Sequence, residues 1–366
     1  MGLMTLLWIG ACISAILSRL MIPHILVISK RKKLFDEPDQ RKLHVTPIPR
    51  LGGVAFMPAM VISLSVIAGL AFQLAEGLSI YLLSQLFALF TGMTILFMTG
   101  LTDDLVSVGY RKKFLIQILC ASLLPLSGVS IDCFYGLFGV DQIPVWVGAL
   151  LTVLLTVFIT NAINLIDGVD GLASGLTILI CGCYTALFAM DNHWFYATVS
   201  LCTVGVLIPF FSYNVFGSVE RGTKIFMGDT GSLTIGFLVS FLTISYCGDP
   251  DAVTDNPLLT CFALLLVPCL DVLRVMLHRA RKGQPIFLPD RNHIHHKLID
   301  VGCSPKQTLA ILLGMTMGYA LLNLLLQEWL DIHVLIVLDI LSWTVLNIWL
   351  TRLIQQRRVG KETGVR

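Results

Sequence analysis

NAINLIDGVDGLASG, residues 161–175, lies between two long apolar runs and shows how the whole chain is built. Its fifteen residues include two amides, Asn161 and Asn164, two carboxylates, Asp167 and Asp170, and three glycines. A carboxylate that faces lipid beside about 20 apolar residues costs a few kcal/mol, so such groups usually mark a functional site. A polar turn between two spanning helices needs only one or two polar residues. This dense array therefore predicts a functional site at the end of a membrane span.

The composition predicts a polytopic membrane protein. Of 366 residues, 56% are hydrophobic and 13% are charged, and the mean hydropathy is +0.83. These values exclude an ordinary soluble domain. A net charge of +2 gives no indication of nucleic-acid binding. The ten cysteines contain no CxxC pair and no spacing typical of a disulfide framework or a zinc site, so we interpret them as small apolar residues of the spans.

Apolar runs of spanning length predict eleven transmembrane helices. The first covers residues 1–20 and lacks the basic start and the cleavage site of a signal peptide. The other ten begin near Leu51, Tyr81, Phe114, Ile143, Leu172, Phe195, Gly231, Pro257, Gln307 and His333. We therefore predict an all-α polytopic integral membrane protein that forms a single domain over residues 1–366.

The positions of the basic residues predict how the chain is oriented. If the N-terminus lies outside, all 25 Lys and Arg fall in five cytoplasmic segments, 19–50, 111–113, 221–224, 274–306 and the tail from 352. The opposite connections carry only acidic charges. By the positive-inside rule, this asymmetry places the C-terminus in the cytoplasm.

The same topology brings five polar segments to the cytoplasmic face. They are RKLHVTPIPRLGG (41–53), TGLTDDLVSVGYRKK (99–113), residues 161–175, YNVFGSVERGTKIFMGDTGS (213–232) and LPDRNHIHHKL (288–298). Five polar segments on one face predict one shared site. A transporter would be expected to hold polar groups near the bilayer midplane, where this sequence offers only Asp339 and a few hydroxyls and amides.

The carboxylates of these segments suggest a site for a cation. Adjacent Asp103 and Asp104 oppose each other's ionisation unless a divalent metal or a lysine intervenes, and Lys113 is near enough in sequence to fold back. Asp229 stands between two glycines just before a span. Mg²⁺ favours one or two protein oxygens with waters and substrate phosphates, so Asp229 with an amide oxygen from Asn161 or Asn164 would suit it.

The histidine-rich segment is less specific. His293, His295 and His296 lack the four ligands of a structural zinc site, so we expect them to bind phosphate oxygens or to position a base. Asp271 and Arg274, one turn apart, are either a helix-surface ion pair or a pair that orients this histidine loop.

Taken as a set and in this order, the motifs from RKLH to HIHHKL resemble the polyprenyl-phosphate N-acetylhexosamine-1-phosphate transferases. The chain looks most like the bacterial undecaprenyl-phosphate GlcNAc-1-phosphate transferases that begin O-antigen, enterobacterial common antigen or wall teichoic acid synthesis. The branch that starts peptidoglycan typically has three successive histidines, whereas this chain has His293-Ile294-His295-His296. Eukaryotic relatives lack carboxylates at the positions of Asp167 and Asp170.

The resemblance implies a reaction and its partners. A UDP-sugar, with UDP-GlcNAc expected, gives its sugar 1-phosphate to undecaprenyl phosphate and releases UMP. The cofactor would be Mg²⁺, with Mn²⁺ as the substitute. The enzyme would lie in the bacterial plasma membrane with its active site on the cytoplasmic face, and its lipid substrate would come from the bilayer.

The resemblance also implies roles for individual residues. Asp229 and Asn164 match the metal positions, Asp170 the contact to uracil, Asn214 the amide near the nucleoside and Lys113 the lysine near the phosphates. The predicted catalytic set is Asp103, proposed as a base, Asp104 and Asp167, which support the metal or the geometry, and His295 and His296. The predicted substrate-binding set is Lys113, Asn161, Asp170, Asn214, Arg291 and His293.

Two other functional classes are considered. One is a transporter or flippase for lipid-linked sugars. The other is a CDP-alcohol phosphotransferase, whose DGxxAR signature is missing because Asp170-Gly171 is followed by Leu-Ala-Ser-Gly. The sequence leaves open which N-acetylhexosamine is used and which surface polymer is begun. Small residues such as Gly314 and Gly318 permit the close helix contacts of a homodimer without requiring them.

Overall fold

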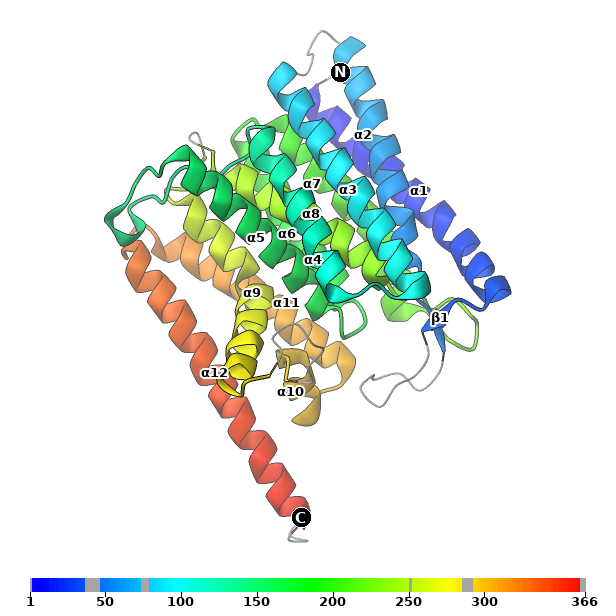
Figure 1. Cartoon of the computed structure of the whole chain (residues 1–366), viewed down its shortest axis with the longest axis vertical. Coiled ribbons are helices and arrows are strands. Elements are labelled where there is room, and N and C mark those ends of the chain that lie inside the picture. The colour runs from blue at the N-terminus through cyan, green and yellow to red at the C-terminus, as the bar shows by residue number, and fades with distance from the viewer. Residues whose placement is uncertain (1, 37–46, 74–78, 250–251, 285–291, 363–366) are drawn as a thin grey trace.

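The computed structural model describes residues 2–36, 47–73, 79–249, 252–284 and 292–362. Within these ranges nearly all regular structure is helical, as predicted (Figure 1). The helices are α1 (Leu3–Lys32), α2 (Phe56–Gln73), α3 (Ile80–Val106), α4 (Tyr110–Leu126), α5 (Val145–Ile166), α6 (Leu172–Met190), α7 (Trp194–Phe216), α8 (Gly228–Cys247), α9 (Pro257–Arg281), α10 (Ile294–Asp300), α11 (Pro305–Leu326) and α12 (Ile332–Glu362). Two-residue strands β1 (Phe35–Asp36) and β2 (Ile48–Pro49) pair antiparallel, and 3₁₀ turns cover Gly52–Ala55 and Leu137–Gly139.

Ten of these helices are long and apolar enough to cross a membrane, which confirms the all-α polytopic class. Eleven spans were predicted, and within the described residues the difference lies in one segment. The run expected from Phe114 is α4, which has 17 residues and carries Arg111, Lys112 and Lys113 in its first turn. Too few apolar residues remain in α4 for a crossing of ordinary length, which takes about 20.

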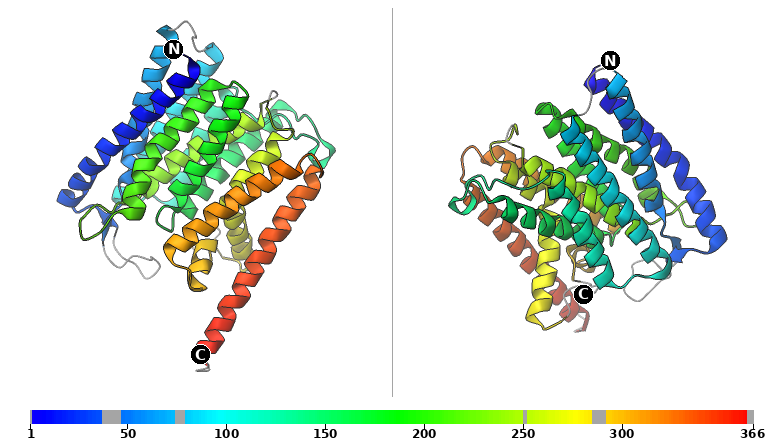
Figure 2. Two further views of the ribbon diagram at one scale, coloured as in Figure 1. Left: turned by 180° about the vertical axis from the view of Figure 1, so that it is seen from behind. Right: turned by 45° about the horizontal axis from the view of Figure 1, so that its top comes forward.

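The order of the helices places the two ends of the chain far apart. Figure 1 shows the N-terminus at the top of the molecule and the C-terminus at the tip of α12 at the bottom. Figures 1 and 2 place α1 and α12 on opposite flanks of the bundle. The predicted orientation in the membrane, with the N-terminus outside, stays a prediction.

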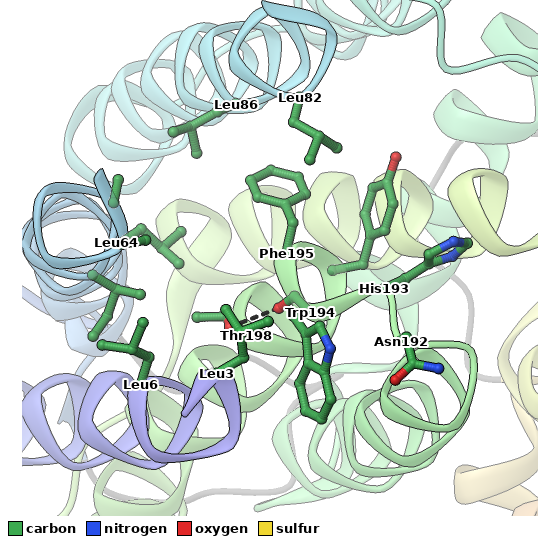
Figure 3. Close-up of a pocket in the computed structure, with 14 residues that line it drawn as sticks. Leu3, Leu6, Leu64, Leu82, Leu86, Asn192, His193, Trp194, Phe195 and Thr198 are labelled. Carbon is green, nitrogen blue, oxygen red and sulfur yellow. Dashed lines mark hydrogen bonds between the residues drawn. The ribbon is translucent and has the colours of Figure 1, made fainter. Parts of the chain in front are cut away.

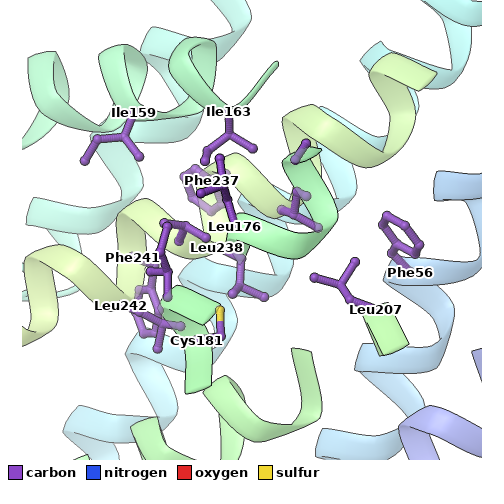
Figure 4. Packing of buried hydrophobic residues seen from close by; sticks show 14 of the residues in the cluster. Phe56, Ile159, Ile163, Leu176, Cys181, Leu207, Phe237, Leu238, Phe241 and Leu242 are labelled. Atoms are coloured by element: carbon purple, nitrogen blue, oxygen red, sulfur yellow. The ribbon is translucent and has the colours of Figure 1, made fainter. Parts of the chain in front are cut away.

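Helix α8 forms the centre of the bundle. In its apolar window 94% of the residues are buried, whereas in α11 the share is 22%. A helix that is apolar on every side belongs inside a bundle. Figure 4 shows Phe237, Leu238 and Phe241 of α8 among side chains from neighbouring helices, including Ile159 and Ile163 of α5. The N-terminal end of α8 is therefore held in place by the whole core.

Glycines allow two helices to approach α8 closely. A Cβ atom added to Gly100 of α3 would lie 2.5 Å from the carbonyl oxygen of Asp229. One added to Gly236 of α8 would lie 2.9 Å from the backbone of Thr160 on α5. Small residues of this kind let the backbones of membrane helices touch. As a result, the end of α3 and the end of α5 both meet the start of α8.

A separate cavity lies at the other end of the bundle. It has a volume of about 270 Å³ and is bounded by Leu6 of α1, Leu64 of α2, Leu86 of α3 and Phe195 of α7 (Figure 3). Leu86 and Asp103 of α3 are 17 positions apart, which is about 25 Å at the helical rise of 1.5 Å per residue. The cavity is therefore distant from the predicted functional residues and is mostly apolar.

Replacing Gly236 with leucine should destabilise the protein, because the new side chain would meet the backbone of α5. Overpacking of this kind costs about 1–3 kcal/mol. We expect a clear drop in the thermal unfolding midpoint of the purified protein in detergent. The matched control is Gly314→Leu, since nothing lies within 4 Å of a Cβ at Gly314. Equal midpoints for the two variants would contradict the packing described here.

Candidate active site

The start of α8 is tied to the end of α3 by one carboxylate. Asp104 accepts hydrogen bonds from the backbone nitrogens of Asp229 (3.0 Å) and Thr230 (2.9 Å), and from the Thr230 hydroxyl (2.6 Å). The first N–H groups of a helix lack partners within the helix and carry partial positive charge, so a carboxylate is well suited to cap them. Asp104 is only 6% exposed. Asp104 therefore holds in position the turn that carries Asp229.

The turn before α8 requires a glycine. Gly228 has φ of +72°, and a Cβ there would lie 2.1 Å from the carbonyl oxygen of Arg50 and 2.5 Å from an oxygen of Asp104. Nearby, Gly52 and Gly53 donate backbone hydrogen bonds to the carbonyls of Phe226 (2.8 Å) and Met227 (2.9 Å). Gly52 and Gly53 end the first of the five polar segments, so these bonds bring that segment next to the turn before α8.

Lys113 at the start of α4 forms a bridge between two carboxylates. Its ammonium lies 3.0 Å from Oδ2 of Asp103 and 2.8 Å from Oδ2 of Asp229. The expectation that Lys113 folds back toward the acidic pair is met for Asp103 and not for Asp104. The cation between them reduces the repulsion between these two acidic groups.

Asn164 at the end of α5 completes the surroundings of Asp229. Its side-chain amide donates to Oδ1 of Asp229 (3.2 Å) and to the hydroxyl of Ser232 (2.8 Å). Asn161, one turn earlier, bonds instead to Gln117 of α4 and to the carbonyl of Val157. Of the two amides considered from sequence, Asn164 is the one that contacts Asp229.

The oxygen atoms gathered here suit a hard divalent cation. Asp229 supplies a carboxylate, and Asp103 adds a second one across Lys113. The amide nitrogen of Asn164 faces Asp229 here, so this amide would have to turn for its oxygen to bind a metal. Within the described ranges, no group of three His, Cys, Asp or Glu could hold a metal by itself. Mg²⁺ commonly binds through one or two protein oxygens together with substrate phosphates. These residues therefore fit Mg²⁺ bound jointly with a phosphorylated substrate.

Asn214 joins the 167–171 loop to the segment that leads into α8. Its carbonyl oxygen Oδ1 accepts from the backbone N–H of Gly171, and its amide donates to the carbonyl of Ile225 (2.7 Å). The side chain is only 4% exposed. Lys224 adds a second link, with its ammonium 2.6 Å from Oδ2 of Asp170. A direct contact of Asn214 with a nucleoside stays a prediction, because its amide is occupied by the backbone here.

Asp167 lies near enough to the other acids of the site for their charges to act on it. Burial among protein atoms, followed by repulsion from Asp229, Asp170 and Asp104, raises the pKa of the Asp167 carboxyl to about 7. The residue is nevertheless exposed at the surface, where solvent screens these charges.

The histidine loop is held by a buried aspartate of α9. Asp271 accepts from Nδ1 of His293 (2.8 Å), from the backbone of Ile294 (3.0 Å) and from Arg274 (2.8 Å). Asp271 is completely buried. Of the two interpretations of Asp271 and Arg274, the one in which they orient the histidine loop is therefore correct.

His295 packs against the 167–171 loop. It is 1% exposed, and a Cβ added to Gly168 would lie 2.3 Å from its Nε2 atom. Its ring stacks on His293 with centroids 5.6 Å apart and lies 4.3 Å from the ring of His296. Burial, with smaller contributions from the other histidines, lowers the pKa of His295 to about 3, so the ring is neutral. Whether His295 or His296 contacts a substrate stays a prediction.

The structure thus brings Asp103, Asp104, Lys113 and Asn164 to the start of α8, whereas Asn161 is bonded elsewhere. Asp170, Asn214 and His295 meet at the 167–171 loop. Arg291, and residues 41–46 of the first polar segment, lie outside the described residues. The sequence reasoning passed over Lys224, Thr230 and Ser232. The sequence carries one indication that Lys224 belongs to the site, which is its nearness to the Gly-Asp turn in GTKIFMGD.

Replacing Asp104 with asparagine should destabilise the protein more than the same change at Asp103. The NH₂ group of the new asparagine would face an N–H donor at the start of α8 and could not accept its hydrogen bond. Losing a hydrogen bond to a charged group costs about 1.5–3 kcal/mol. Thermal unfolding of the purified variants tests this, with exposed Asp132→Asn as the control. A midpoint for Asp104→Asn equal to that of Asp103→Asn would show that Asp104 is not the cap.

The raised pKa of Asp167 predicts a pH-dependent effect. Because the folded state holds this proton more tightly than the unfolded chain, the stability of the wild-type protein falls as pH rises from the unfolded pKa, near 4, through about 7. Asp167→Asn cannot ionise, so its unfolding midpoint should exceed that of the wild type at pH 8 and approach it at pH 5. The measurement is made with a chelator present. A constant difference across this range would contradict the assignment.

Comparison with known proteins points to one family. A family model described as "Glycosyl transferase family 4" matches residues 86–247. The chain is 32% identical over 309 residues to the Bacillus subtilis (strain 168) "Probable undecaprenyl-phosphate N-acetylglucosaminyl 1-phosphate transferase", covering 83% of this chain and 81% of that protein. It is 30% identical over 317 residues to the Mycobacterium leprae (strain TN) "Decaprenyl-phosphate N-acetylglucosaminephosphotransferase", covering 78% and 75%. It is 27% identical over 294 residues to the Yersinia pestis "Undecaprenyl-phosphate alpha-N-acetylglucosaminyl 1-phosphate transferase", covering 80% and 76%.

Proposed function

The chain belongs to the polyprenyl-phosphate N-acetylhexosamine-1-phosphate transferase family, and from this premise we propose that it transfers GlcNAc 1-phosphate from UDP-GlcNAc to undecaprenyl phosphate and releases UMP. The names of relatives from two bacteria specify this lipid and this sugar. The ten apolar helices suit an enzyme whose acceptor is dissolved in the bilayer. The family relationship favours a transferase over the transporter considered from the sequence.

The observation that supports the proposal best is the arrangement around Asp229. One of its oxygens meets the ammonium of Lys113 and the other meets the amide of Asn164. Transfer of a phosphoryl group needs charge neutralisation and accurate positioning more than covalent help from the protein. A carboxylate with an amide for Mg²⁺ and a lysine beside it supply both requirements.

In the proposed reaction, Asp229 and Asn164 would hold Mg²⁺, or Mn²⁺ in its place, against the diphosphate of the donor. Bound there, the metal would neutralise negative charge on the phosphate oxygens. Lys113 would donate to the same oxygens, and Asp103 would keep its ammonium in position from the far side. The carboxyl of Asp170 would receive the uracil.

A strong base is not required for the acceptor. The second pKa of a phosphate monoester is about 6, so undecaprenyl phosphate is largely ionised at neutral pH. An oxygen of the lipid phosphate can therefore attack the β-phosphorus of UDP-GlcNAc without first losing a proton. The bond from the β-phosphorus to the bridging oxygen breaks, and UMP leaves with that oxygen. On this account Asp103 acts through Lys113, as a positioning residue.

The enzyme is proposed to work at the inner surface of a bacterial plasma membrane. The distribution of Lys and Arg orients the site toward the cytoplasm, where nucleotide sugars are made. The product, a sugar joined to the lipid through a diphosphate, would be extended by later transferases of cell-surface polysaccharide synthesis.

Purified protein incubated with UDP-GlcNAc, undecaprenyl phosphate and Mg²⁺ should release UMP in step with the lipid product. Asp229→Ala should abolish release, because it removes the carboxylate that both Lys113 and Asn164 contact. Asp132→Ala, a change at an exposed acid on another connection, is the control. Chelation of divalent ions should stop the reaction and added Mg²⁺ should restore it. Full activity of folded Asp229→Ala would remove the metal assignment, and no UMP from the wild type would remove the proposed reaction.

A further inference from the structure

The apolar cavity at the end of the bundle away from the candidate active site has a polar neighbour. This second cavity has a volume of about 340 Å³ and lies between the start of α3, the end of α8 and residues 128–130. Leu82, His193 and Tyr196 line both cavities. The apolar cavity and the polar cavity therefore adjoin each other and share one wall.

Two buried side chains give the polar cavity its hydrogen-bonding character. Gln85 is 1% exposed, and its Oε1 atom accepts from the hydroxyl of Tyr196 at 2.6 Å. Its amide nitrogen carries two N–H donors, and within the described ranges it donates to no protein atom. Asp249 is 5% exposed, and its Oδ2 atom lies 2.6 Å from Nδ1 of His193. Because buried polar groups are normally hydrogen-bonded, the amide of Gln85 indicates a polar ligand in this cavity.

The apolar cavity is suited to a hydrocarbon chain. Figure 3 shows Leu64 of α2, Leu86 of α3 and Phe195 of α7 around it. Three of its surrounding helices, α1, α2 and α3, have only 33%, 39% and 39% of their apolar windows buried, so much of their surface faces lipid. An apolar space among such helices favours a lipid chain over water.

Aromatic side chains indicate how deep in the membrane the two cavities lie. Tyr81, Trp194 and Tyr196 line them, and Trp and Tyr are enriched where a membrane meets water. Leu3 and Leu82, in the first turns of α1 and α3, line the apolar cavity. A lipid at this depth can place its head group in the polar cavity and a hydrocarbon chain in the apolar one.

The charge at this end of the bundle favours a head group that carries a cation. Residues 114–220 and 225–273, which contain the connections around the polar cavity, include no Lys or Arg. Asp249 brings a carboxylate to the wall of this cavity. Like charges repel and opposite charges attract strongly where water is largely excluded, so an ammonium suits this place better than an anionic head group.

From these observations we propose that the two cavities form one binding site for a membrane phospholipid with a primary-amine head group, phosphatidylethanolamine. Its ammonium pairs with Asp249, its phosphate accepts from the amide of Gln85, and one acyl chain fills the apolar cavity. Because the walls come from α1, α2, α3 and α7, the bound lipid holds these helices together. The lipid site does not depend on the proposed function, since none of its residues belongs to the candidate active site.

The first test compares two phospholipids on the full chain. Protein freed of lipid in detergent is titrated with phosphatidylethanolamine or with anionic phosphatidylglycerol, and bound lipid is counted by native mass spectrometry. We expect one phosphatidylethanolamine to bind about tenfold more tightly than phosphatidylglycerol, as for a contact between charged groups, and to raise the thermal unfolding midpoint. Equal binding of the two lipids, or tighter binding of phosphatidylglycerol, would overturn the proposal.

The second test fills the apolar cavity. Ala68 lines it, so Ala68→Phe should weaken phosphatidylethanolamine binding by about tenfold or more while the unfolding midpoint without lipid stays at or above that of the wild type. Leu70→Phe is the matched control, because Leu70 is 37% exposed and lies outside the cavity lining. Unchanged lipid binding in folded Ala68→Phe would show that the acyl chain lies elsewhere.

The third test removes the charge that recognises the head group. Asp249→Asn should bring the two lipids to similar affinities by weakening phosphatidylethanolamine alone, an outcome that a misfolded protein could not produce. Asp255→Asn, at an exposed acid of the same connection that does not line the cavity, should keep the preference. A preference that survives in folded Asp249→Asn would rule out recognition of the amine by Asp249. Water-soluble glycerophosphoethanolamine should bind far more weakly than the lipid, and equal binding would exclude the apolar cavity from the site.

Discussion

The three hydrogen bonds from the start of α8 to the Asp104 carboxylate are the contact on which the site depends. They join two helices that cross the bundle, and they do so beside the buried core of α8. The position of Asp229 is therefore set by the packing of the whole protein and not by a loop. Such support suits a site whose main task is to hold charged groups in fixed positions.

Two lysines divide the site into two ends. Lys113 balances Asp103 and Asp229 at the end assigned to phosphate, and Lys224 balances Asp170 at the end assigned to the nucleobase. Each lysine pairs with a carboxylate that remains partly accessible. Opposite charges in partly buried surroundings attract strongly, so these lysines and carboxylates hold one another in the arrangement proposed to bind the donor.

The histidines contact a different part of the site from the two lysines. Asp271 holds His293 in place through a hydrogen bond. His295 is neutral and buried, and it packs against Gly168. A cationic phosphate-binding role for His295 would need its pKa to rise far above its value of about 3. The 167–171 loop against which His295 packs carries Asp167 and Asp170. The histidine segment therefore positions this loop even where it touches no substrate.

The sequence by itself determined the class of protein, most of its long helices and the family, because hydropathy, charge placement and motif order are all properties of the linear chain. It also paired Lys113 with the acids and placed Asn164 near Asp229. Only the tertiary structure decided that Asp104 caps α8 while Asp103 faces Lys113, that Asn164 and not Asn161 meets Asp229, and that Lys224 belongs to the site. Neighbouring residues on a helix point in different directions, and the partner of each one depends on how closely the helices approach. That approach is set by contacts such as those of Gly100 and Gly236, which no pattern along the chain reveals.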